Sequence, residues 1–161
     1  MRRMVFVLSV TLIMGLGVGM IGDQMLPAQP AGDIEHVKAA NQAFYEAFSG
    51  RDMKRMDQIW AHEPHVHVIH LRSKEVLSGW EAVRKSWEET FAGFEQVTVA
   101  MPDAQVRVGQ DVAWIVGHEH LQGRRPGGDV VTGRVLATNV FEKRGDRWLM
   151  VHHHASRPPT P

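Results

Sequence analysis

Apolar residues in the first half of the chain recur every three to four positions, which is the spacing of an amphipathic helix. The pattern predicts three helices: one over residues 34–49, a short one capped by Asp52, and one that opens at Ser78 with Glu81 completing a capping box. Each is followed by a residue that favours a helix end, namely Gly50, Pro64 and Gly93. Their predicted buried faces carry Val37, Phe44 and Phe48, then Met56 and Trp60, then Trp80, Val83, Trp87 and Phe91.

Single-residue alternation replaces the helical spacing at residues 65–71 and again after residue 94, and it predicts strands. The later strand-like segments cover residues 94–108, 111–121, 130–143 and 147–155. Gly109-Gln110 and residues 144–147 have the chemistry of hairpin turns. Three helices followed by such a meander predict an α+β domain, in which the helices cover the concave side of a strongly curved antiparallel sheet and leave a cavity there.

The N-terminus predicts export. Arg2 and Arg3 precede an uncharged apolar stretch over residues 4–22, as in a signal peptide, and the stretch is just long enough to serve as an uncleaved membrane anchor. We therefore divide the chain into residues 1–32 (signal peptide or signal anchor plus a Pro-containing linker), 33–157 (the folded domain) and 158–161 (a tail). The domain is expected to be periplasmic or secreted, and to be membrane-anchored only if residues 4–22 are retained.

The amino-acid composition argues against several classes of function. The 18 Lys and Arg residues balance the 18 Asp and Glu residues, so binding of nucleic acid through phosphate charges is not expected. The chain has 10 His and one Tyr, and its charge should rise steeply as pH falls from about 7 to about 5.5. The absence of Cys excludes disulfides and a thiol nucleophile. No phosphate-binding Gly-rich loop or haem attachment motif occurs, so no cofactor is predicted.

Five local sequences, in the right order, resemble the SnoaL-like branch of the nuclear transport factor 2-like superfamily. They are FYEAF at 44–48, GWEAV at 79–83, DVAW at 111–114, TNVF at 138–141 and WLMVHHHAS at 148–156. The last hairpin is also similar to the association domain of calcium/calmodulin-dependent protein kinases. The resemblance implies a cone-shaped half-barrel with a pocket between helices and sheet. It also implies dimerisation through the outer sheet face, and functions that range from isomerases, cyclases and dehydratases to non-enzymatic assembly domains.

Histidines near the strand ends are the candidate catalytic groups. Alternation on the last strand groups Leu149, Val151, His153 and Ala155 on one face, and Trp148, Met150, His152 and His154 on the other. Both faces are apolar, so the pattern does not say which is inside. Arginines that line the pocket of the kinase association domains are matched here by His118, Asn139 and Ala155, which argues against carboxylate binding by that route. The resemblance implies that His118, Asn139 and His153 look into the pocket.

We therefore expect His118 or His153 to act as a general acid or base on a small, largely apolar molecule, because a neutral imidazole titrates near ambient pH. The remaining ligand-binding candidates are Asn139, His70, Trp80, Trp87 and Trp114. The alternative is structural: these histidines close hydrogen bonds between strands and helices, and the tryptophans are core.

Three other functions stay open. Ketosteroid-isomerase-like members of the superfamily use a carboxylate and a tyrosine, for which Glu119, Asp57 and Tyr45 are the candidates. A zinc or copper site is the second, because pairs of imidazoles share a strand face at His65, His67, His118, His120, His152 and His154. A non-catalytic domain that forms a homodimer through its sheet is the third.

Overall fold

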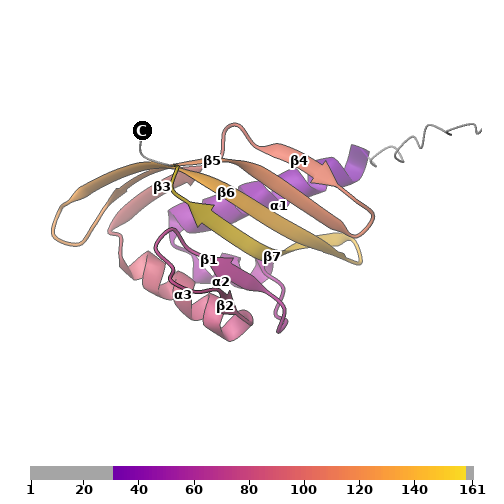
Figure 1. The fold of residues 1–161 in the computed structure, drawn as a ribbon, viewed down its shortest axis with the longest axis horizontal. Coiled ribbons are helices and arrows are strands. Elements are labelled where there is room, and N and C mark those ends of the chain that lie inside the picture. The colour runs from indigo at the N-terminus through magenta and orange to yellow at the C-terminus, as the bar shows by residue number, and fades with distance from the viewer. Residues whose placement is uncertain (1–30, 159–161) are drawn as a thin grey trace, which may run out of the picture.

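The computed structural model describes residues 31–158 and folds them into three helices packed on one curved sheet (Figure 1). The helices are α1 (Ala31–Gly50), α2 (Met53–Ile59) and α3 (Trp80–Ala92). The strands are β1 (His67–Ile69), β2 (Leu77–Ser78), β3 (Gln96–Ala100), β4 (Gln105–Val108), β5 (Val112–Arg124), β6 (Val130–Arg144) and β7 (Arg147–Ser156). The sheet order is β2-β1-β7-β6-β5-β3, with β4 also paired to β5. The long β5–β6 hairpin extends past the rest of the sheet.

The α+β class and the helix-covered curved sheet predicted from the sequence are confirmed, with one difference in strand direction. β5, β6 and β7 pair antiparallel, as expected for a meander. β1 instead runs parallel to β7, with His67 opposite His152 and Ile69 opposite His154. The sheet is therefore mixed, and the C-terminal ends of β1 and β7 lie at the same edge.

Two of the predicted helix signals work as expected and one does not. The Asp52 carboxylate accepts a hydrogen bond from the Arg55 amide at 3.0 Å and caps α2, and Gly93 caps the C-terminal end of α3. The predicted capping box at Ser78 and Glu81 does not form. The N-cap of α3 is Gly79, whose φ of 82° lies in the region that favours glycine.

The single strand predicted over residues 94–108 is divided into β3 and β4 by a turn at Pro102 and Asp103. Proline has no amide hydrogen and cannot continue a ladder at that position. β5 pairs with β4 up to Val116 and with β3 from His120 onward, which leaves the His118 amide without a strand partner on that side. The Asp103 carboxylate accepts this amide hydrogen at 2.8 Å and so replaces the missing strand.

A β-bulge in β7 explains why both faces of this strand carry apolar residues. Val140 pairs with His152 and the next residue of β6 pairs with Met150, so Val151 is an extra residue. The bulge shifts the alternation by one position, and the grouping of Trp148 and Met150 with His152 and His154 is therefore wrong. The residues of β7 that are buried are Trp148, Met150, Val151, His153 and Ala155.

The core lies between α1, α3 and the concave face of the sheet. Phe44, Trp87 and Phe141 are fully buried there, and the rings of Phe44 and Trp87 meet edge to face with centroids 5.4 Å apart. Within residues 31–158, no helix combines the length and the apolar character needed to cross a bilayer. The predicted export segment, residues 4–22, lies outside the described residues, as do the last three residues of the tail.

Candidate functional site

A cavity of about 350 Å³ lies between the helices and the concave face of the sheet. Most of its wall is apolar and includes Phe48 of α1, Trp87 of α3, and Leu121 and Val135 of β5 and β6. The imidazoles of His70 and His153 and the carboxyl group of Glu119 also line it, and all three are buried or half-buried. An apolar hollow with a few convergent polar groups is typical of a small-molecule site.

Buried hydrogen bonds tie Glu119 to the first helix. Asn139 of β6 donates through Nδ2 to Oδ1 of Asn41 at 2.7 Å and to Oη of Tyr45 at 3.1 Å. Tyr45 in turn donates to Oε1 of Glu119 at 2.9 Å. Because α1 supplies Asn41 and Tyr45 one turn apart, both side chains face the sheet. The network fixes the Glu119 carboxyl at the cavity wall.

The same network sets the tautomer of His153. The amide nitrogen of Asn139 is used in the two bonds to α1, so its Oδ1 is the acceptor for Nδ1–H of His153, at 2.7 Å. A neutral His153 therefore carries a free lone pair on Nε2. This nitrogen lies 3.9 Å from Oε1 of Glu119. A base and a carboxyl group thus stand side by side in a largely apolar cavity.

Burial moves these two groups toward their neutral forms. Glu119 is 4% exposed, and burial raises its pKa to about 7, although the hydrogen bond from Tyr45 acts in the opposite direction. Burial also lowers the pKa of His153 well below its usual range, reinforced by the nearby His70 imidazole. The pKa of Tyr45 is raised by burial and by the Glu119 charge, so Tyr45 remains a hydrogen-bond donor. Near neutral pH the site contains a half-protonated acid beside a neutral base.

His70 forms another part of the same wall. Its Nε2 lies 2.9 Å from Oγ of Ser86, which itself donates to the Val83 carbonyl at 2.6 Å, so His70 is the donor in this contact. The imidazole packs edge to face on Trp87 with centroids 4.7 Å apart. Burial lowers the pKa of His70 to about 4. His70 is therefore neutral at pH 7, with Nδ1 as its free acceptor.

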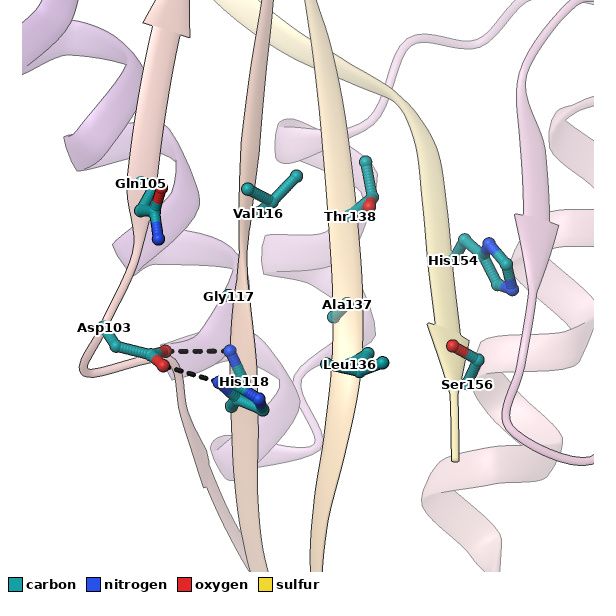
Figure 2. Close-up of a pocket in the computed structure, with 10 residues that line it drawn as sticks. All are labelled: Asp103, Gln105, Val116, Gly117, His118, Leu136, Ala137, Thr138, His154 and Ser156. Carbon is teal, nitrogen blue, oxygen red and sulfur yellow. Dashed lines mark hydrogen bonds and ion pairs between the residues drawn. The ribbon is translucent and has the colours of Figure 1, made fainter. Parts of the chain in front are cut away.

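The expectation that His118, Asn139 and His153 all look into the pocket is wrong for two of them. His118 lies on the opposite face of the sheet, and Asn139 is buried behind His153 without lining the cavity. His118 and Glu119 are neighbours on β5 and point to opposite faces. His118 lines an outer hollow of about 290 Å³, where its Nδ1 lies 2.6 Å from the Asp103 carboxylate (Figure 2). The interior position on this strand belongs to Glu119, which sequence reasoning considered only as one of two unmatched carboxylates.

Only one of the three tryptophans predicted to bind ligand lines the cavity. Trp87 is fully buried against it, and its indole N–H has no acceptor among the described residues. Trp80 packs against Trp60 and stacks on His62 with centroids 4.5 Å apart, away from the cavity lining. Trp114 is 44% exposed on the outer face of the sheet, where a ligand in the cavity would not reach it.

The six histidines considered for a metal site are spread along the sheet. His65 contacts Glu63 and Glu142, His118 contacts Asp103, and His120 is exposed. His67, His152 and His154 are neighbours: the ring centroids of His67 and His152 lie 6.4 Å apart, and those of His152 and His154 lie 6.3 Å apart. Among residues 31–158, no group of three or more His, Asp or Glu side chains is arranged to hold a metal ion.

Comparison with known proteins places these features in a family. The sequence profile of the SnoaL-like domain family matches residues 37–161. The F-box protein SKIP8 of Arabidopsis thaliana is 31% identical over 118 residues, which is 73% of this chain. The chain spans about half of that relative, 48% of its length.

Two solved structures of similar sequence share the fold. A provisionally assigned dehydratase of the NTF2-like family from Streptomyces avermitilis is 31% identical, with a TM-score of 0.75 over 81% of this chain and 100% of that chain. A provisionally assigned calcium/calmodulin-dependent protein kinase type II association domain from Thiobacillus denitrificans is also 31% identical, with a TM-score of 0.66 over 76% of this chain and 94% of that chain.

Proposed function

Because this chain belongs to the SnoaL-like domain family, we propose that its helix–sheet cavity binds a small, largely apolar molecule and transfers protons on it through Glu119 and His153. The observation that carries the proposal is the pairing of these two groups, 3.9 Å apart, in a cavity that is otherwise mainly apolar. A buried acid and base with shifted pKa values, placed together in a cleft, are typical of a catalytic site. The predicted catalytic role of His153 is kept here, and Glu119 takes the place of His118.

The arrangement suits paired general acid and base catalysis. Nε2 of His153 accepts a proton from a substrate carbon. Glu119, whose pKa is raised to about 7, donates a proton to a substrate oxygen, for example a hydroxyl that leaves. In a dehydration, the C–H electron pair would form the double bond while the C–O bond breaks, and the hydroxyl would leave as water. Asn139 positions His153, and Tyr45 positions Glu119. The similarity to the Streptomyces dehydratase supports this reaction class, and an isomerisation would need the same two groups.

Binding of 2-naphthol, a fluorescent apolar probe with one acidic hydroxyl, tests the proposal. The probe hydroxyl should donate to the free Nε2 of His153, so His153→Gln should weaken its binding about five- to tenfold, the loss of roughly one hydrogen bond. His154→Gln is the matched control, because His154 lies next to His153 but faces the outer hollow. Equal effects of the two substitutions, or no binding by the wild type, would overturn the proposal.

The outer face of the sheet supports a second role in assembly, as in the association domain from Thiobacillus. Val112, Trp114 and Leu136 are 43%, 44% and 41% exposed on this face, and apolar side chains exposed together on one surface are typical of a protein–protein interface. We propose that two copies of the chain pair through it. Light scattering should then give a dimer that Trp114→Glu converts to a monomer. A monomeric wild type at micromolar concentration would remove this role.

We also propose that the protein works outside the cytoplasm, on the strength of Arg2, Arg3 and the apolar residues 4–22. Cell fractionation followed by N-terminal sequencing tests this. A mature N-terminus near residue 32 in the exported fraction supports it, and full-length protein in the cytosol contradicts it.

A further inference from the structure

Three arginines from distant parts of the chain line the same cavity as Glu119 and His153. Arg72 follows β1, Arg125 follows β5 and Arg157 follows β7. β1 is parallel to β7. β5 and β7 are both antiparallel to β6, so β5 runs in the same direction as β7 and β1. The C-terminal ends of the three strands therefore point the same way (Figure 1). This topology brings one arginine that follows each strand to the cavity lining.

These arginines have no counter-charge in the part of the chain that the structure describes. Arg72 and Arg157 are exposed and Arg125 is half-buried, so they form the rim of the cavity and not its floor. Over residues 31–158, none of the three guanidinium groups takes part in an ion pair or a side-chain hydrogen bond, whereas Arg55, Arg84 and Arg144 all do. Glu119 is the one acidic residue of the cavity lining, and it is buried and bonded to Tyr45.

A rim with three unpaired positive charges above an apolar hollow matches one class of ligand. Guanidinium groups bind carboxylates through paired, charge-assisted hydrogen bonds, and a cleft lined by charges of one sign attracts the opposite charge. An apolar body would fill the walls formed by Trp87, Leu121 and Val135. The volume of about 350 Å³ is near the lower end of the range for ligand pockets, roughly 300–1,000 Å³, so the ligand is small.

We infer that the ligand of this cavity is a small amphipathic carboxylic acid, with its carboxylate held at the rim by Arg72, Arg125 and Arg157 and its apolar body inside. The inference rests on the proposed function, and it adds the chemical class of the substrate. These arginines differ in position from His118, Asn139 and Ala155, which the resemblance described above matches to the pocket arginines of the kinase association domains. The anchored carboxylate would leave the other end of the molecule to face Glu119 and His153.

Calorimetric titration with straight-chain carboxylates from butanoate to decanoate, and with the primary alcohols of the same lengths, tests the inference. The wild type should bind the best carboxylate at least about tenfold more tightly than the matching alcohol, and added salt should reduce this preference. The triple variant Arg72→Gln, Arg125→Gln, Arg157→Gln should lose the preference and bind the alcohol as before. None of the three side chains forms a hydrogen bond or an ion pair within residues 31–158, and Gln keeps part of the aliphatic stem, so the variant should remain folded.

The matched control removes the same charge elsewhere on the sheet, through Arg107→Gln, Arg124→Gln and Arg134→Gln, all exposed and outside the cavity lining. It should keep the preference for carboxylates within about twofold. Equal losses in the two triple variants, or equal binding of alcohol and carboxylate by the wild type, would overturn the inference. Alcohol binding without a carboxylate preference would leave the proposed function standing, whereas binding of neither series would remove both.

Discussion

Replacing Glu119 with Gln should change how the stability of the domain depends on pH. Burial raises the pKa of Glu119 from the ordinary 4.5 to about 7, so between these two pH values the folded protein holds a proton that the unfolded chain has lost. The free energy of unfolding of the wild type therefore falls as pH rises through this window. Gln does not titrate, and its carbonyl oxygen can still accept the hydrogen bond from Tyr45. The variant should not show this loss.

The size of the effect follows from the difference between the two pKa values. A difference of 2.5 units corresponds to about 3.4 kcal/mol over the full window, and to about 2.5 kcal/mol between pH 5 and pH 8. Urea denaturation followed by tryptophan fluorescence at both pH values gives the free energy of unfolding of each protein. On going from pH 5 to pH 8, Glu119→Gln should gain about this amount relative to the wild type.

Glu95→Gln is the control, because Glu95 is exposed and its carboxylate has no hydrogen bond or ion pair among the described residues. It should follow the wild type at both pH values. Titration of the buried histidines affects wild type and variants alike and cancels in the comparison. A relative change for Glu119→Gln below about 0.5 kcal/mol, no larger than that of an ordinary surface substitution, would refute the buried, protonated Glu119.

Three further predictions concern other parts of the structure. Burial lowers the pKa of His70 to about 4, so the wild type loses stability as pH falls below 6.5, and His70→Gln should gain about 2 kcal/mol relative to it between pH 7.5 and pH 5 in urea titrations. Trp87→Ala should lower the free energy of unfolding by about 3–5 kcal/mol, and the exposed Trp114→Ala by about 1 kcal/mol or less. Asp52→Ala removes the cap of α2 and should cost about 1 kcal/mol in thermal or urea unfolding.

The sequence pattern predicts the elements of this fold well because most of them depend on local periodicity. The three helices, the hairpin turns and the four long strand-like segments all follow from spacing and turn residues that lie within a few positions of one another. The exceptions depend on distant contacts. Parallel pairing of β1 with β7 joins segments 85 positions apart, as His67 and His152 show. The break between β3 and β4 falls at Pro102, and the contact of Asp103 with His118, 15 positions further along the chain, stabilises it.

The candidate site is harder to predict because strand alternation gives two faces without saying which one is inside. On β5 the choice lies between His118 and Glu119, and the three-dimensional contact of Glu119 with Tyr45 decides it. A single buried carboxylate in an otherwise apolar alternation is a weak signal that could have indicated the interior face. On β7, the extra residue Val151 shifts the alternation, and no local sequence feature marks that bulge.

The grouping of three arginines at the cavity rim could not be predicted from the sequence either. Arg72 and Arg125 are 53 positions apart, and Arg157 is a further 32 positions along the chain. Each one, taken alone, is typical of a solvated loop. Only the common direction of β1, β5 and β7 brings the three to one opening, so a sequence reading without strand directions has no means of grouping them.

The central claim is that the cavity between the helices and the concave face of the sheet is the binding site, and that Glu119 and His153 transfer protons there. Two-dimensional ¹H–¹⁵N NMR of the folded protein during titration with 2-naphthol tests it most directly. We predict that the largest shift changes occur at the amides of His70, Glu119 and His153, which line the cavity. Changes confined to His118 and His154 on the outer face, or no changes up to the solubility limit of the probe, would contradict the account.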